Sequence, residues 1–150
     1  MNLKQDINQD LKQALLGGDK LKSETLRVIK SVVLNEEIAQ NKREQGLTDE
    51  EIIACLRKEV KKRQEAAELY KEAGSDERAN KELAEKEIIE AYLPELMPDE
   101  EIERLIDDVV SKHGNVTGQT MGIIIGEVKK SSKGTADGAT VARLVKSRLS

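Results

Sequence analysis

The 150-residue sequence contains no phenylalanine or tryptophan, and Tyr70 and Tyr92 are its only aromatic residues. A buried core must therefore consist of aliphatic side chains, and a site that stacks nucleic-acid bases has few side chains to use. The single cysteine, Cys55, excludes an internal disulfide and is typical of a reducing compartment. The single histidine, His113, leaves few arrangements for acid–base catalysis or metal binding.

Long apolar runs are absent as well. No segment approaches the roughly 20 consecutive apolar residues that a membrane-spanning helix needs. The first ten residues, MNLKQDINQD, lack the apolar centre of a secretion signal. The sequence therefore predicts a cytoplasmic protein that does not enter a membrane.

Apolar residues instead recur at helical spacing. The first predicted helix has Leu3, Ile7, Leu11 and Leu15 on one face and stops at glycines 17 and 18. A second is expected from about residue 19 to 45, and a third from a capping box at Thr48 to Gly74. Residues 75–81 fit either a polar connection or the start of a fourth helix, which stops before Pro94 because proline disfavours helical geometry in the preceding residue.

The segment from Pro94 to Pro98 is the predicted domain boundary, because a new helix can start there. After that helix, residues 121–126 (MGIIIG) fit either a short buried strand or a helix. The lack of a partner strand favours a helix, with Gly122 and Gly126 on one face where a neighbouring helix can approach closely. A last helix starts at Asp137. We expect an all-α fold, with an N-terminal helical bundle at 1–95 and a small three-helix domain at 96–150.

The charge is unevenly distributed along this chain. Residues 116–150 carry a net charge of +4, whereas the preceding 115 residues carry −8. A basic end on an acidic protein is one of the few composition signals that point to a polyanionic partner. The candidate phosphate contacts, including backbone amides at the start of the last helix, are Lys129, Lys130, Lys133, Gly134, Gly138, Arg143, Lys146 and Arg148.

A second basic run lies in the predicted third helix, where four cations occupy a third to a half of the circumference. Two interpretations stay open for it: a ridge that contacts phosphates, or a solvated charged face balanced by nearby acids. The four residues are Arg57, Lys58, Lys61 and Lys62.

No residue pattern indicates a self-sufficient catalytic site, a metal site or a cofactor. His113 is expected at a helix C-terminus, where an imidazole commonly interacts with free carbonyls. Cys55 is expected at the edge of an apolar stripe, as a buried structural thiol. There is no phosphate-binding loop and no nucleophile elbow. We therefore expect a protein that is not an enzyme by itself.

Several short motifs occur in an order known from one family. Met121-Gly122-x-x-x-Gly126, then Lys133-Gly134-x-Ala136-Asp137-Gly138, resembles the C-terminal signature of the GatB/YqeY family. The order of the upstream strings resembles the free-standing YqeY-type member: Thr25-Leu26-Arg27, Leu47-Thr48-Asp49, Lys62-Arg63-Gln64-Glu65, Glu85-x-Glu87 and Tyr92-Leu93-Pro94.

The resemblance implies a helical bundle joined to a tail like that of the B subunit of the tRNA-dependent amidotransferase. In that enzyme the chemistry lies elsewhere and the tail helps to hold tRNA. Three hypotheses follow: a non-catalytic accessory protein that binds tRNA or another structured RNA; an adaptor for an aminoacyl-tRNA synthetase or amidotransferase; or an assisting role in carbon–nitrogen ligation with glutamine as amide donor.

Overall fold

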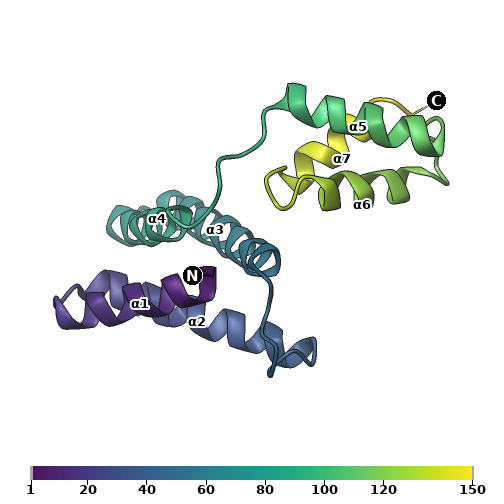
Figure 1. Ribbon diagram of the computed structural model, residues 1–150. Helices are drawn as coiled ribbons and strands as arrows, with labels where there is room; N and C mark the ends of the chain where they lie inside the picture. Colours follow the sequence, from purple (N-terminus) through teal and green to yellow (C-terminus); the bar gives the residue numbers. More distant parts are fainter. Residues whose placement is uncertain (1, 150) are drawn as a thin grey trace. The chain divides into compact units, whose positions relative to one another are not determined.

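The computed structural model describes residues 2–149, and within that part every regular element is an α-helix (Figure 1). Seven helices are found there and no strand, so the prediction of an all-α fold is confirmed. The chain divides into two compact units, Met1–Leu93 and Pro94–Ser150, which are described separately below. The predicted folding domains, 1–95 and 96–150, stay a prediction.

Unit 1 contains four helices, α1 (Leu3–Leu16), α2 (Lys20–Ala39), α3 (Asp49–Glu72) and α4 (Asp76–Glu90). Helix α1 packs on α2, and α3 lies along α4 (Figure 1). Helix α2 also contacts α3 and α4, so the two pairs share one core. This core is aliphatic, with a cysteine as its one other member: Ile7, Leu11, Leu26, Ile29, Val33, Leu47, Ile52, Cys55, Leu56 and Ile89.

The predicted capping box at the start of α3 is confirmed. The Glu51 amide donates to Thr48 Oγ1 at 3.2 Å, and the Thr48 amide donates to Glu51 Oε1 at 3.0 Å. Two of the amides that have no partner inside a helix are thereby satisfied. The same arrangement, made by Asn2 and Gln5, opens α1.

Helix α2 ends at Ala39, so the expected end near residue 45 is wrong. Asn41 takes a left-handed conformation (φ 55°), which breaks the helix. The buried Glu37 carboxylate also draws the following loop inward, because its Oε2 accepts from the Leu47 amide at 3.2 Å and from Lys4 Nζ at 2.8 Å. Gly46 allows this approach, since a Cβ there would lie 3.2 Å from Glu37 Oε2.

Helix α4 begins at Asp76, so residues 76–81 are helical rather than a polar connection. Ala79 is completely buried, which gives this first turn a packing face. Further along, Arg63 of α3 pairs with Glu82 at 3.4 Å and with Glu85.

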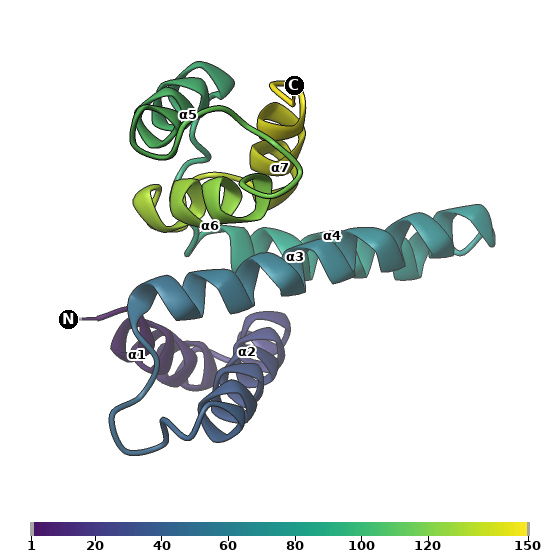
Figure 2. The same cartoon turned by 90° about the vertical axis from the view of Figure 1, so that its right-hand side faces the viewer.

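Unit 2 contains three helices, α5 (Asp99–His113), α6 (Met121–Ser131) and α7 (Gly138–Lys146) (Figure 2). Each of the three packs on the other two. Their core is again aliphatic: Ile102, Ile106, Val109, Val116, Ile124, Val128, Ala136, Val141, Leu144 and Val145. The segment before α5 is hydrogen-bonded to the α6–α7 loop: the Met97 amide donates to the Thr135 carbonyl at 2.7 Å.

The role predicted for two glycines of α6 is not borne out within unit 2. Gly122 and Gly126 are exposed, and a Cβ at either position would meet nothing within 4 Å. They therefore do not provide a close helix–helix contact there. The inward side of α6 is formed instead by Ile124 and Val128, which are fully buried.

Replacing Gly126 by alanine should stabilise unit 2. The added methyl group meets no atom, and alanine is favoured over glycine inside a helix by about 0.5–1 kcal/mol. Amide hydrogen exchange of α6 and α7 in Gly126→Ala measures the change. A loss of protection relative to the parent protein would contradict the open environment of this glycine.

Replacing Glu37 by glutamine should destabilise unit 1 by about 1–3 kcal/mol near pH 7, because Lys4 loses its buried partner. Tyrosine fluorescence during urea unfolding reports this unit alone, since both tyrosines lie in it. The exposed Glu44→Gln is the matched control and should stay within about 0.5 kcal/mol of the parent.

The effect of Glu37→Gln should also depend on pH. The hydrogen bond from Lys4 is the main reason that the pKa of Glu37 lies below its ordinary value of 4.5. A carboxylate whose pKa is lowered by folding stabilises the fold above its unfolded pKa, and this contribution disappears as the pH falls through the folded pKa. The difference between parent and variant should therefore shrink below about pH 4.5, and a constant difference would contradict this role.

Candidate nucleic-acid interface

The predicted basic residues of the tail begin at the end of α6. Lys129 and Lys130 lie in its last turn, where cations complement the negative end of the helix dipole. Lys133 then takes a left-handed conformation (φ 52°), followed by Gly134 (φ 80°), which turns the chain sharply. Ser132, just before the turn, is buried, and its hydroxyl donates to the Lys129 carbonyl at 2.8 Å. Lys133 is consequently held on the outside of an ordered loop.

Lys129 reaches from α6 to the start of α7. A Cβ built on Gly138 would lie 3.2 Å from Lys129 Cε and 3.3 Å from its Nζ, so the lysine lies against this glycine. A side chain at position 138 would have to displace the ammonium group. The structure thus brings together Lys129 and Gly138, two of the residues that the sequence predicted as phosphate contacts.

The start of α7 is already capped by its own carboxylate. Asp137 Oδ2 accepts from the Thr140 amide at 3.0 Å and from its hydroxyl at 2.8 Å. A phosphate at this helix end would meet the negative charge of Asp137. The amides expected to bind phosphate after Gly138 are therefore less suited to that role than the neighbouring lysines.

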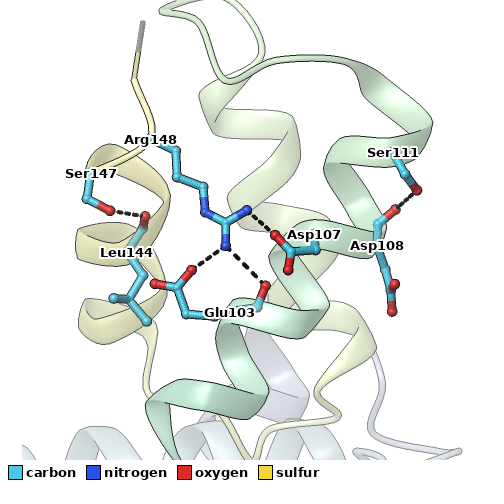
Figure 3. Close-up of polar contacts among 7 residues, drawn as sticks. All are labelled: Glu103, Asp107, Asp108, Ser111, Leu144, Ser147 and Arg148. Atoms are coloured by element: carbon cyan, nitrogen blue, oxygen red, sulfur yellow. Dashed lines mark hydrogen bonds and ion pairs between the residues drawn. The ribbon is translucent and has the colours of Figure 1, made fainter.

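The two arginines of the tail are engaged with α5. Arg148 pairs with Glu103 and Asp107, and its guanidinium also donates to the Glu103 carbonyl at 3.3 Å (Figure 3). Burial opposes the charge, but the hydrogen bonds that Arg148 donates to Glu103 and Asp107 outweigh it and raise the pKa of Arg148. Arg143 pairs with Asp99 at 3.2 Å, and both of these side chains are exposed. Arg148 therefore ties the segment that follows α7 to α5, and its predicted role as a phosphate contact stays a prediction.

A pattern of acidic residues in the sequence of α5 indicates this pairing. Asp99, Glu103 and Asp107 recur every four residues and so form one acidic stripe along α5. Arg143 of α7 and Arg148, which follows the end of α7, pair with acids of this stripe. A regular row of acids on one helix can indicate basic partners on another.

Four lysines of the tail, residues 116–150, remain available. All four are exposed, and none has an ion-pair partner among residues 2–149: Lys129, Lys130, Lys133 and Lys146. Three of them lie within five residues at the end of α6 and its loop, and Lys146 lies at the far end of α7. The candidate interface consists of these lysines, which we call the lysine surface.

The basic run of α3 is divided by the fold. Lys58, Lys61 and Lys62 are exposed, whereas Arg57 is half-buried. Arg63, which continues the run, is bound to the acids of α4. Three lysines of the predicted ridge thus face solvent, and the interpretation as a solvated charged face stays open for them.

The side chains of His113 and Cys55, which could take part in catalysis, are engaged in contacts within the fold. His113 Nε2 lies 2.8 Å from Glu127 Oε1 of α6, so its recorded partner is a carboxylate rather than the helix carbonyls we expected. Cys55 is buried as expected, and burial raises the pKa of its thiol. Over residues 2–149, no three histidine, cysteine or acidic side chains are grouped as metal ligands would be. None of the helices described combines the length and the apolar character needed to span a membrane.

A family model described as "Yqey-like protein" matches residues 4–149. The chain belongs to this family. A relative in Vanderwaltozyma polyspora, "Altered inheritance of mitochondria protein 41, mitochondrial", is 28% identical over an alignment of 116 residues, and the match covers 73% of this chain. The match spans 62% of that relative's own length. The more specific resemblance to the tail of an amidotransferase B subunit stays a prediction.

Replacing Arg148 by methionine should destabilise unit 2 by on the order of 1 kcal/mol, because Glu103 and Asp107 lose their shared partner. Arg143→Met is the matched control, and its exposed pair with Asp99 should contribute less. Amide exchange across α5 and α7 measures both. Equal effects of the two substitutions would contradict the structural role assigned to Arg148.

Proposed function

We propose that this protein is a non-catalytic accessory protein of tRNA metabolism that binds tRNA, or a similarly folded RNA, through the lysine surface of unit 2. The observation that favours it most is the contrast among the tail's cations. The two arginines are paired with acids of α5, whereas Lys129, Lys130, Lys133 and Lys146 have no acidic partner among the residues described. Unpaired lysines on an ordered scaffold are suited to phosphate groups.

The chemistry of this surface favours recognition of the RNA backbone. Unit 2 contains no phenylalanine, tyrosine or tryptophan, because both tyrosines lie in unit 1. Few side chains there can stack on bases, so affinity would come mainly from phosphates and from the shape of a folded RNA. We place the protein in the cytoplasm as part of this proposal, although the named relative is described as mitochondrial.

A salt series tests RNA binding. Binding of purified tRNA to the full chain should weaken steeply with added salt, because each lysine–phosphate contact releases a counterion. The triple variant Lys129→Glu, Lys130→Glu, Lys133→Glu should bind at least about tenfold more weakly near 100 mM salt. If three contacts are lost, the slope of log K against log salt should fall by about 2–3.

The matched control is Lys12→Glu, Lys20→Glu, Lys71→Glu, which changes the net charge equally on exposed residues of unit 1. It should bind nearly as the parent does. A third triple variant, Lys58→Glu, Lys61→Glu, Lys62→Glu, tests the second basic run. Equal binding by the parent and the tail variant, or no binding by either at low salt, would refute the proposal.

A second candidate, an adaptor for an aminoacyl-tRNA synthetase or tRNA-dependent amidotransferase, is favoured by one feature of α6. Ile123 is 55% exposed between the exposed Gly122 and Gly126, which leaves a small apolar face uncovered within unit 2. Binding to a purified synthetase or amidotransferase that survives ribonuclease and is lost in Ile123→Asp would favour this candidate. In either case an assisting role in glutamine-dependent amide formation requires a partner enzyme.

A further inference from the structure

Unit 1 contains a small, partly open pocket between α1, α2 and the loop that follows α2, with a volume of about 130 Å³. Its wall is mainly apolar and includes Ile7, Val33 and Leu34. Ile7 and Val33 belong to the core of the unit, so the wall is held by buried packing. This part of the pocket is therefore fixed by the core, whereas Lys4, Lys30 and Arg43 line the rest of it with longer side chains.

The volume limits the occupant to a small group. An apolar protein cavity of about 150 Å³ accommodates one benzene molecule. A single phenyl ring or a short branched alkyl chain thus matches the size of this pocket. Long-chain lipids and nucleotides are too large to be enclosed.

Cations surround the pocket, and most of their charge is not compensated. Glu37 lies at the pocket, but its carboxylate is bound by Lys4 at 2.8 Å and by the Leu47 amide at 3.2 Å. Lys30 and Arg43 also line the pocket, are exposed, and have no ion-pair partner among residues 2–149. The lining consequently keeps two positive charges after the Lys4–Glu37 pair is counted.

An apolar wall beside two uncompensated cations is complementary to an amphiphilic anion. The planar guanidinium of Arg43 is suited to a carboxylate, which it can bind with two parallel hydrogen bonds. We propose that this pocket binds a small free monocarboxylate with a compact apolar body, such as an arylacetate. The apolar group would lie against Val33 and Leu34, with its carboxylate at Lys30 and Arg43. This site shares no residue with the lysine surface and does not depend on RNA binding.

Phenylacetate and its neutral analogue phenylacetamide test the proposal on the full-length protein. With methyl groups of isoleucine, leucine and valine labelled, NMR should show shifts at Ile7, Val33 and Leu34 on addition of phenylacetate. For so small a ligand a Kd of about 1 mM is expected. Phenylacetamide should bind at least about fivefold more weakly, since it lacks the charge that Lys30 and Arg43 recognise.

The variant Lys30→Ala, Arg43→Ala should weaken phenylacetate binding about tenfold and leave phenylacetamide nearly unchanged. Lys12→Ala, Lys20→Ala removes two exposed lysines of α1 and α2 that do not line the pocket, and it should bind like the parent. The proposal is overturned by equal affinities for acid and amide, by shifts confined to other methyl groups, or by no shift up to about 20 mM phenylacetate. An equal loss in both double variants would also overturn it.

Discussion

The structure depends on the almost entirely aliphatic character of its two cores. Each unit buries a cluster of ten residues without a phenylalanine or tryptophan. Aliphatic contacts are non-directional, so many helix registers bury nearly the same area. Polar contacts at the edge of each core then define the geometry. Glu37 joins α1, α2 and the loop before α3 in unit 1, and Arg148 joins α5 and α7 in unit 2.

These polar contacts also determine which charges remain for binding. Arg63, Arg143 and Arg148 are each paired with acids of a neighbouring helix. Most lysines of the two basic runs stay exposed instead. A compact, strongly hydrated ammonium group suits a phosphate backbone reached through water, and it provides no planar surface for a base. In the tail, the paired arginines and the exposed lysines are therefore consistent with the proposed recognition of a polyanion by charge and shape.

Local patterns in the sequence predicted the helices, but not the contacts between distant residues. The capping box at Thr48 and the stop after α1 follow from neighbouring residues, and both were predicted correctly. The end of α2 was predicted incorrectly, because it depends on the Glu37 carboxylate, whose partner Lys4 lies 33 residues earlier in the sequence. Gly122 and Gly126 make no close helix contact within unit 2, and spacing alone does not tell which face of a helix is covered. The role of Arg148 required knowing that α7 packs on α5.

The capped start of α7 places a further limit on how RNA could be held. Asp137 gives this helix its N-cap, so its carboxylate cannot leave without exposing the Thr140 amide. A phosphate near Gly138 would therefore have to be bound by Lys129 against the repulsion of Asp137. Lys130 and Lys133, on the end of α6 and its loop, are not among the neighbours of Gly138. It follows that the outer lysines should contribute at least as much to affinity as the one that lies closest to the helix terminus.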